Sequence, residues 1–276
     1  MTAIKKSPSQ IKEEVREGYT RRIEGKSEGC CTSSCCGGES GKHARSIGYD
    51  DQTLAALPDH AVENSFGCGN PLAFSEVKEG DTVVDIGSGA GIDCFVAAGR
   101  VGESGRVIGI DMTDAMLEKA TANAQAGGFS QVEFRKGEAE NMPVDRDSVD
   151  WVISNCVINL SPDKPAVFSE IGRVLKSGGR FSISDVVAGN DLPEEIANNL
   201  PAWTGCLAGA IREEEYLAGL AAAGLTDIRV TERLYYSREE LNHMAGEMGI
   251  DPDLTARHID ELADRIWSAK IVGRKV

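Results

Sequence analysis

The chain has 276 residues, which suits one domain of ordinary size with additional segments and allows a full core to be buried. Its formal net charge of −15 argues against nucleic acid or an anionic membrane as a partner, because such surfaces are bound by clusters of lysine and arginine. The opening stretch MTAIKKSPSQ has no apolar run, and no stretch approaches the length of a membrane span. We therefore expect neither a signal peptide nor a membrane-spanning helix.

The cysteine content points to thiol chemistry. The chain has eight cysteines and no signal that would direct it out of the cytoplasm, where frameworks of structural disulfides are rare. We therefore expect a cytoplasmic protein whose cysteines carry out thiol chemistry or bind a soft metal.

Residues 1–47 are predicted to form a mobile, cysteine-rich N-terminal segment. Residues 11–22 are charged and could form a helix, which we interpret as a solvated helix or a frayed tail. Residues 24–48 are rich in glycine, serine and charge, which is typical of a mobile segment. Four cysteines within seven residues could bind a metal, but without a CxxC pair a structural zinc site is not favoured, and a tail with incidental cysteines remains an alternative: Cys30, Cys31, Cys35 and Cys36.

The next cysteine lies in a turn. The sequence of residues 67–71 is GCGNP, whose glycines, asparagine and proline are typical of turns. This composition predicts that Cys68 is presented at a loop rather than packed inside a strand.

Residues 81–93, DTVVDIGSGAGID, predict a strand, a glycine-rich turn and the start of a helix. Thr82–Ile86 is rich in β-branched residues and bounded by polar ones, as expected of a buried parallel strand. Glycine then alternates with small residues, which lets the backbone turn tightly and approach a bulky ligand: Gly87, Ser88, Gly89, Ala90 and Gly91. This combination indicates a nucleotide-type site at the edge of a parallel sheet.

The glycine spacing favours a cationic nucleoside ligand over a dinucleotide. A dinucleotide fingerprint is GxGxxG, but the pattern here is GxGxG with isoleucine at position 92. The preceding carboxylate of Asp85 would repel a pyrophosphate and could pair with a positive centre. Asp111 lies 20 residues after Gly91, at the end of the next strand, where a carboxylate accepts hydrogen bonds from ribose hydroxyls. A ligand with ribose, a positive centre and no phosphate suggests S-adenosylmethionine; a generic α/β turn and an NAD site remain alternatives.

Strand and helix patterns alternate through the middle of the chain, which predicts a doubly wound, mostly parallel α/β sheet. We expect strands at Thr82–Ile86, Arg106–Ile110, Val132–Lys136, Asp150–Ser154 and Arg180–Val187, and helices near Ile92–Ala98, Asp114–Ala126 and Ala166–Leu175. Ligands of such sheets lie beyond the carboxyl ends of the strands. We therefore predict these cofactor-binding residues: Asp85, Gly87, Ser88, Gly89, Gly91, Asp111, Met112, Glu138, Ala139 and Asn155.

Two further cysteines in this region receive different interpretations. Cys156 follows the fourth predicted strand, so we expect it to face the ligand. Cys94 lies on the apolar helix after the glycine turn, where core packing is the expected role.

The C-terminal part adds a cap to the sheet. Residues 190–210 contain glycines, a proline and Cys206, and we predict that they fold over the ligand crevice as a substrate cap. A helix at residues 211–223, a strand at 227–236, mainly helical structure at 237–264 and a closing strand at 267–274 follow. We therefore divide the chain into an N-terminal segment at 1–47, a cofactor-binding domain at 48–189, and a cap with a C-terminal α+β extension at 190–276.

Several of these stretches together resemble one family. From about Gly48 to its end, the chain resembles the arsenite methyltransferases, which are S-adenosylmethionine enzymes of the class I methyltransferase (Rossmann-like) fold. The resemblance is carried by SFGCGNP, DIGSGAGID, SNCVINLSPDK, EIGRVLKSGGRFSISDVV and TGCLAGA. Glycine turns of this type occur in many methyltransferases, whereas the three cysteine contexts are much more restricted.

The resemblance implies a metalloid site made of cysteines. It assigns arsenic binding to Cys156 and Cys206, with Cys68 either completing a three-thiolate site or cycling through a disulfide. A further family cysteine lies in the N-terminal segment, and its match among the four candidates there stays open. The implied substrates and products are arsenite and methylated arsenicals.

Thiol chemistry agrees with this implication. Thiolates are soft ligands that select soft centres such as trivalent arsenic, and three of them leave arsenic a lone pair that can attack a methyl group on a sulfonium. Methylation formally oxidises arsenic, so nearby thiols that reduce it would end as a disulfide. A cytoplasmic thioredoxin or glutathione system would then restore the thiols.

Two other functions stay open at this point. The chain could methylate a small organic acceptor such as a quinone or a sterol, with its cysteines serving only in packing. It could instead bind metalloids without turnover, as a sensor or a sequestering protein.

Overall fold

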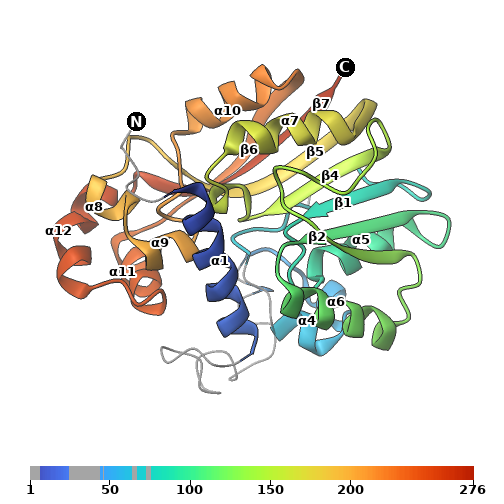
Figure 1. Ribbon diagram of the computed structural model, residues 1–276, viewed down its shortest axis with the longest axis horizontal. Helices are drawn as coiled ribbons and strands as arrows, with labels where there is room; N and C mark the ends of the chain where they lie inside the picture. The colour runs from blue at the N-terminus through green and yellow to red at the C-terminus, as the bar shows by residue number, and fades with distance from the viewer. Residues whose placement is uncertain (1–6, 25–43, 46, 64–66, 73–75) are drawn as a thin grey trace.

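The computed structural model describes residues 7–24, 44–45, 47–63, 67–72 and 76–276. Within these residues one mixed sheet has the strand order β3-β2-β1-β4-β5-β7-β6, and helices cover both of its faces (Figure 1). Strands β1 to β5 run parallel, and β7 is antiparallel to β5 and to β6. The strands are β1 (Thr82–Ile86), β2 (Arg106–Asp111), β3 (Val132–Lys136), β4 (Val149–Asn155), β5 (Leu175–Ala188), β6 (Leu225–Tyr235) and β7 (Ile266–Lys275). The predicted doubly wound, mostly parallel sheet is therefore confirmed.

The helices follow the predicted alternation. They are α1 (Pro8–Ile23), α3 (Asp51–Ala55), α4 (Asp59–Glu63), α5 (Ile92–Val101), α6 (Asp114–Gly127), α7 (Lys164–Val174), α8 (Glu194–Ala197), α9 (Leu200–Thr204), α10 (Glu213–Ala222), α11 (Arg238–Glu247) and α12 (Pro252–Leu262), with a 3-10 helix at Ile158–Leu160. None of the helices described is long and apolar enough to cross a membrane.

The start of β5 is the element boundary that differs most from its prediction. We expected this strand at Arg180–Val187, yet it begins at Leu175. Leu175 pairs with Val149, and Arg180 pairs with Trp151, so the residues between them form an irregularity in the ladder. Gly178 has a φ of 81° there, which suits glycine. The chain thus turns at Gly178 without leaving the sheet.

Alternation along the strands divides the core between the two faces of the sheet. Val84 and Ile86 of β1 belong to an apolar cluster with α7 and α10, whereas Val83 belongs to a cluster with α5. This follows from the period of two in a strand, which points successive side chains to opposite faces. Asp85 therefore points toward the α5 side.

A third apolar cluster joins the N-terminal helix to the C-terminal helices. It includes Trp203 of α9, Leu241 of α11 and Ile259 of α12, and it also contains Ile11 and Val15 of α1. In Figure 1, α1 runs between α9 and α11 on one side and α6 on the other. The cluster therefore fixes α1 to the rest of the molecule.

The interpretation of residues 11–22 as a solvated helix or a frayed tail is wrong. Helix α1 begins after a capping box formed by Ser7 and Gln10, and Ile11 and Val15 are each only 1% exposed. Gly18 is also buried, so the buried positions follow the spacing of a helix that presents one face to the core. The many charged residues of the other face concealed this stripe in the sequence.

The remainder of the predicted mobile segment lies outside the described residues for the most part. Residues 25–43, with Cys30, Cys31, Cys35 and Cys36, belong to the part of the chain that the structure does not describe.

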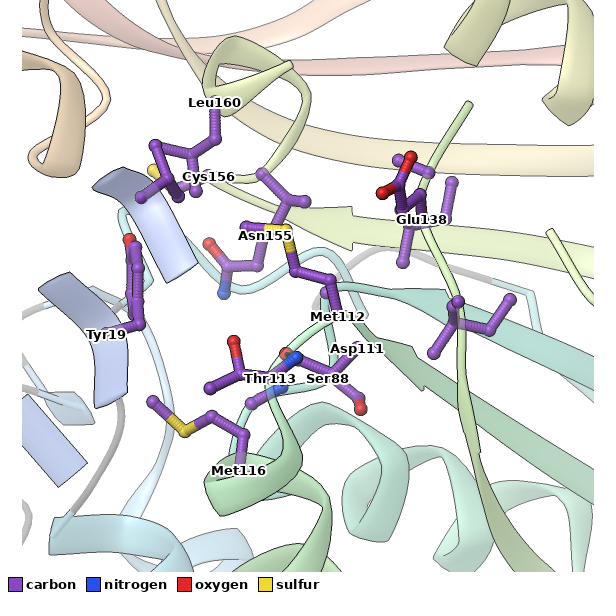
Figure 2. Close-up of a pocket in the computed structure, with 18 of the residues that line it drawn as sticks. Tyr19, Ser88, Asp111, Met112, Thr113, Met116, Glu138, Asn155, Cys156 and Leu160 are labelled. Carbon is purple, nitrogen blue, oxygen red and sulfur yellow. Dashed lines mark hydrogen bonds between the residues drawn. The ribbon is translucent and has the colours of Figure 1, made fainter. Parts of the chain in front are cut away.

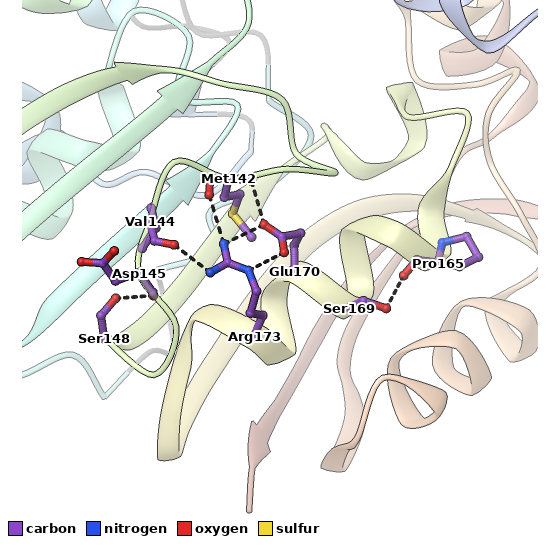
Figure 3. A network of polar contacts seen from close by, with 8 residues as sticks. All are labelled: Met142, Val144, Asp145, Ser148, Pro165, Ser169, Glu170 and Arg173. Carbon is purple, nitrogen blue, oxygen red and sulfur yellow. Dashed lines mark hydrogen bonds and ion pairs between the residues drawn. The ribbon is translucent and has the colours of Figure 1, made fainter.

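A partly buried ion pair fixes the loop that follows β3. The guanidinium of Arg173 in α7 donates to the main-chain oxygens of Met142 (3.0 Å) and Val144 (2.8 Å) and to the carboxylate of Glu170. Glu170 in turn accepts a hydrogen bond from the Met142 N–H (2.7 Å). Figure 3 shows this network between α7 and the loop. Its effect is to fix the far end of the loop that begins at Gly137.

We expect Arg173→Met to lower the free energy of unfolding by about 2–3 kcal/mol, because it leaves two main-chain carbonyls and the Glu170 carboxylate without their donor. Urea unfolding followed by circular dichroism measures this change. Arg146→Met, at an exposed position of the same loop, serves as the control and should alter it by less than about 0.5 kcal/mol. Equal effects of the two substitutions would contradict a stabilising role of the network.

Candidate functional site

A pocket lies at the carboxyl ends of β1, β2 and β4, where the strand order reverses. Its empty space, counted together with the open solvent at its mouth, is about 1020 Å³. Figure 2 shows it with Tyr19 and Glu138 on opposite sides and with Asn155 and Met112 between them. The wall includes the glycine turn and the residues that follow β2, β3 and β4.

The glycine turn lies directly against the residues after β4. Gly87, Gly89 and Gly91 all have positive φ values, of 71°, 51° and 97°. A Cβ at Gly87 would lie 2.2 Å from a methyl carbon of Val157, so a side chain at this position would push β1 and β4 apart at the pocket. The glycines thus serve both the turn and the close approach of two strand ends.

Asp111 connects the end of β2 to the glycine turn. Its carboxylate accepts hydrogen bonds from the N–H of Gly89 (3.0 Å) and of Thr113 (2.8 Å). Burial raises the pKa of Asp111, and these N–H donors oppose the rise. The carboxylate is therefore held in one orientation in the pocket wall.

The polar groups in the wall of the pocket fit S-adenosylmethionine. Ser88 Oγ is buried and has no hydrogen-bond partner among the described residues, so it is available to a polar group of a ligand. The wall carries four carboxyl groups and, within the described part of the chain, a single ammonium group: Asp93, Asp111, Glu138, Glu140 and Lys12. That excess of carboxyl groups suits a cationic ligand and disfavours a pyrophosphate.

Most of the predicted cofactor residues line this pocket. Those in its wall are Gly87, Ser88, Gly89, Asp111, Met112, Glu138, Ala139 and Asn155, together with Cys156. Four predicted site residues lie outside the wall: Asp85, Gly91, Cys68 and Cys206.

Asp85 is buried behind the pocket. It is 2% exposed and accepts a hydrogen bond from the thiol of Cys94 on α5 (3.3 Å). Burial and the neighbouring carboxyl group of Asp93 raise the pKa of Asp85. Asp93, in the first turn of α5, lines the pocket instead. The expected contact between Asp85 and a cationic ligand stays a prediction.

Asp93 was not predicted as a site residue. Its two oxygens accept hydrogen bonds from the hydroxyl of Tyr49 (2.5 Å) and the amide of Asn155 (3.1 Å). Burial raises its pKa to about 6. Its position in the first turn of the helix after the glycine turn is a signal that the sequence did contain.

Helix α1 contributes side chains that the sequence analysis also missed. Lys12, Val15 and Tyr19 line the pocket. The ammonium of Lys12 pairs with Glu138 (2.7 Å) and Glu140 (3.0 Å), both in the loop after β3. Helix α1 therefore closes one side of the pocket and is attached across it.

Three cysteines meet at one end of the pocket. Cys68 and Cys156 are joined by a disulfide, with 5.8 Å between their Cα atoms and a sequence separation of 88 residues. The Cys206 thiol donates to the main-chain oxygen of Cys156 (2.7 Å). Cys156 and Cys206 have positive φ values of 58° and 63°, a conformation that non-glycine residues seldom adopt and that often marks functional sites.

The free thiol lies in a buried environment. Cys206 is 4% exposed, and burial together with the carboxyl group of Asp185 raises its pKa. Burial also raises the pKa of Asp185 to about 7 and lowers that of Lys164 to about 8. The Cys206 thiol is therefore protonated at neutral pH in this state of the protein.

The described cysteines do not form an open three-thiolate site in this state, because the sulfurs of Cys68 and Cys156 are bonded to each other. Among the residues that the structure describes, no group of three or more His, Cys, Asp or Glu side chains is arranged to hold a metal ion.

Comparison with known proteins places the chain among methyltransferases. Residues 77–240 match the family model described as a methyltransferase domain. An arsenite methyltransferase of Halobacterium salinarum is 39% identical over 98% of this chain and 68% of its own length. The arsenite methyltransferase of Mus musculus is 40% identical over 59% of this chain.

A solved structure of an arsenic methyltransferase is also similar to this chain. An arsenic(III) S-adenosylmethionine methyltransferase from Chlamydomonas reinhardtii superposes with a TM-score of 0.69 at 36% identity, covering 82% of this chain and 73% of that one. The chain spans 68% of the halobacterial relative but only 45% of the mouse one. Together with the pocket and the fold, these matches show that the chain belongs to the arsenite methyltransferase family of S-adenosylmethionine-dependent enzymes.

Proposed function

We propose that this protein transfers the methyl group of S-adenosylmethionine to trivalent arsenic held by cysteine thiolates, and that the methylated arsenicals serve arsenic detoxification. One observation carries the proposal. Cys156 lies in the wall of the cofactor pocket, and both other cysteines of the predicted site reach it, Cys68 through a disulfide and Cys206 through a hydrogen bond. The metalloid site and the methyl-donor site would thus share one residue.

The pocket wall would orient the methyl donor. Asp111 would accept hydrogen bonds from ribose hydroxyls, and the glycine turn would lie against the ligand without intervening side chains. Met112 and Ala139 supply apolar surface for a base, while the carboxyl groups favour a positive charge. When bound, S-adenosylmethionine supplies an electrophilic methyl group on a positively charged sulfur.

The cysteines would hold arsenic beside that group. Arsenous acid carries three hydroxyl groups, each of which leaves as water with the proton of one thiol when an As–S bond forms. Cys206 can therefore stay protonated until arsenic arrives, in agreement with its raised pKa. Arsenic bound through three sulfurs retains a lone pair, and Cys156 would place that lone pair at the pocket wall in position to attack.

The disulfide fits the redox change that methylation requires. Loss of its lone pair to the methyl group leaves arsenic pentavalent. Two cysteine sulfurs that join as a disulfide would return two electrons to arsenic. We propose that Cys68 and Cys156 form this pair and that a cytoplasmic thiol system, thioredoxin or glutathione, supplies the two electrons and two protons that reopen it.

The division of labour along the chain is part of the proposal. Residues 48–189 would bind the methyl donor, and residues 190–276 would supply Cys206 and cover the substrate. Residues 1–47 would supply the remaining family cysteine together with α1, which lines the pocket. Strands β6 and β7 complete the same sheet, so the C-terminal part is continuous with the cofactor-binding part.

Product analysis tests the proposed activity. The protein mixed with S-adenosylmethionine, arsenite and excess thiol should form methylarsenicals, detected by liquid chromatography with mass-selective detection of arsenic. Their ratio over time shows where methylation stops. Cofactor binding and arsenite binding without any methylated product would contradict the proposal and indicate a sequestering protein; cofactor binding without arsenite binding would indicate an organic acceptor.

We expect Cys156→Ser and Cys206→Ser each to abolish arsenic methylation while leaving the affinity for S-adenosylmethionine close to that of the parent protein, because a hydroxyl does not replace a soft thiolate ligand. Turnover and calorimetric cofactor binding measure the two effects. Cys94→Ala is the matched control, since Cys94 is buried but contacts Asp85 rather than the other cysteines. Activity retained in both serine variants would exclude the thiolate site.

We expect Asp111→Ala to weaken binding of S-adenosylmethionine by roughly 10- to 100-fold, through loss of charge-assisted hydrogen bonds to the ribose. Because S-adenosylhomocysteine has the same ribose, its affinity should fall by the same factor. Isothermal titration calorimetry measures both. Asp114→Ala, at an exposed position in the first turn of α6, should change neither affinity; an unchanged affinity in Asp111→Ala would remove the ribose assignment.

A further inference from the structure

The side-chain amide of Asn155 holds the turn that carries Cys68. Its Oδ1 accepts hydrogen bonds from the N–H groups of Cys68 (3.0 Å) and Gly69 (3.2 Å). Its Nδ2 donates to the main-chain oxygen of Gly69 (2.6 Å), to the carboxylate of Asp93 (3.1 Å) and more weakly to the hydroxyl of Tyr49 (3.4 Å). Both ends of one amide thus bind the same turn.

The environment allows only one orientation of this amide. Rotating the amide by half a turn would place Oδ1, an acceptor, against two other acceptors, the Gly69 carbonyl and the Asp93 carboxylate. The same rotation would place Nδ2, a donor, against the N–H groups of Cys68 and Gly69. Asn155 is therefore a fixed support rather than an adaptable contact.

The glycines on either side of Cys68 let the turn lie directly against Asn155 and β5. A Cβ at Gly67 would lie 2.3 Å from Asn155 Nδ2, and a Cβ at Gly69 would lie 2.8 Å from Ser184 Oγ. A side chain at either position would lift the turn from β4 and β5. The sequence Gly-Cys-Gly thus lets the main chain rest on Asn155 itself.

The same turn is held at two further points. The hydroxyl of Ser268 on β7 donates to the main-chain oxygen of Cys68 (2.9 Å). The Cys156 N–H donates to the oxygen of Ser184 (2.8 Å), and the Cys68 sulfur lies 3.7 Å from that oxygen. Cys68 and Cys156 are therefore placed against the same point of β5.

From these contacts we propose that Asn155 is a positioning residue for Cys68, holding it within bonding distance of Cys156 when both are thiols. This inference rests on the proposed function, in which this pair cycles between thiol and disulfide. In the oxidised form the disulfide itself holds the turn. In the reduced form the hydrogen bonds of Asn155 hold it, so they raise the effective concentration of one thiol at the other.

The test is the equilibrium of the Cys68–Cys156 disulfide with glutathione. Full-length protein is equilibrated in buffers of reduced and oxidised glutathione, and the disulfide is quantified by alkylation and peptide mass spectrometry. Two protein thiols become one disulfide while one oxidised glutathione becomes two reduced molecules, so atoms and electrons balance. Neither arsenite nor S-adenosylmethionine is present, so failure of the proposed function would leave this result intact.

Asn155→Ala should lower this equilibrium constant by roughly tenfold, because the turn gains freedom in the reduced form only. Asn242→Ala, an equivalent change at an exposed position of α11, should leave it unchanged. Asn155→Ser keeps a polar side chain too short to span the turn, and it replaces the alanine variant if that variant does not fold. An unchanged constant in a folded Asn155 variant, or an equal fall in Asn242→Ala, would overturn the proposal.

Arsenite binding by the reduced protein separates positioning from a role in the pocket wall. Asn155→Ala should weaken arsenite affinity in the parent protein and have no further effect in a Cys68→Ser background, since Asn155 acts through Cys68. Equal weakening in both backgrounds would overturn the proposal. If the parent protein binds no arsenite, the proposed function fails while the glutathione equilibrium still decides the role of Asn155.

Discussion

The close contact between the glycine turn and the end of β4 is the constraint on which the site depends. Gly87 lies so near Val157 that no side chain fits between them, and β1 and β4 are hydrogen-bonded neighbours up to that point. Because the parallel strands end together, the glycine turn and Cys156 are brought into one pocket wall. Cys156 lies in the pocket wall because it is the first residue after β4.

A buried polar cluster lies beside the third cysteine, Cys206, which contacts Cys156 from outside the pocket wall. The carboxyl group of Asp185 accepts hydrogen bonds from Asn159, Tyr216 and the Val186 N–H. A Cβ at Gly209 would lie 1.9 Å from the main-chain oxygen of Asn159, so the segment with Cys206 rests directly on the chain that follows β4. Hydrogen bonds between buried groups are strengthened by such a low-dielectric setting and favour one arrangement of Asn159 and Asp185. The same burial raises the pKa of the Cys206 thiol and keeps it neutral, which agrees with the proposal that As–S bonds form with loss of water.

Much of this arrangement could be predicted from local sequence. The β-branched runs and the glycine turn identified the parallel strands, and the rule that ligands bind beyond the carboxyl ends of such strands identified most of the pocket wall. Helix α1 could not be predicted in this way. Its buried positions have an apolar stripe of only a few residues, and its place depends on surfaces of α9 and α6 that come from distant parts of the chain. The disulfide between Cys68 and Cys156 also depends on contacts across 88 residues.

The position of Asp85 shows where more could have been read from the sequence. Val84 and Ile86 point to the α7 side, so the period of two along β1 directs Asp85 to the α5 side. Cys94 follows nine residues later on the apolar helix and meets that carboxyl group beneath the sheet edge. The helix that begins after the glycine turn directs its first turn, and with it Asp93, toward the crevice. The two acids of this motif thus differ in position, because Asp85 is buried beneath the turn whereas Asp93 lies in the pocket wall.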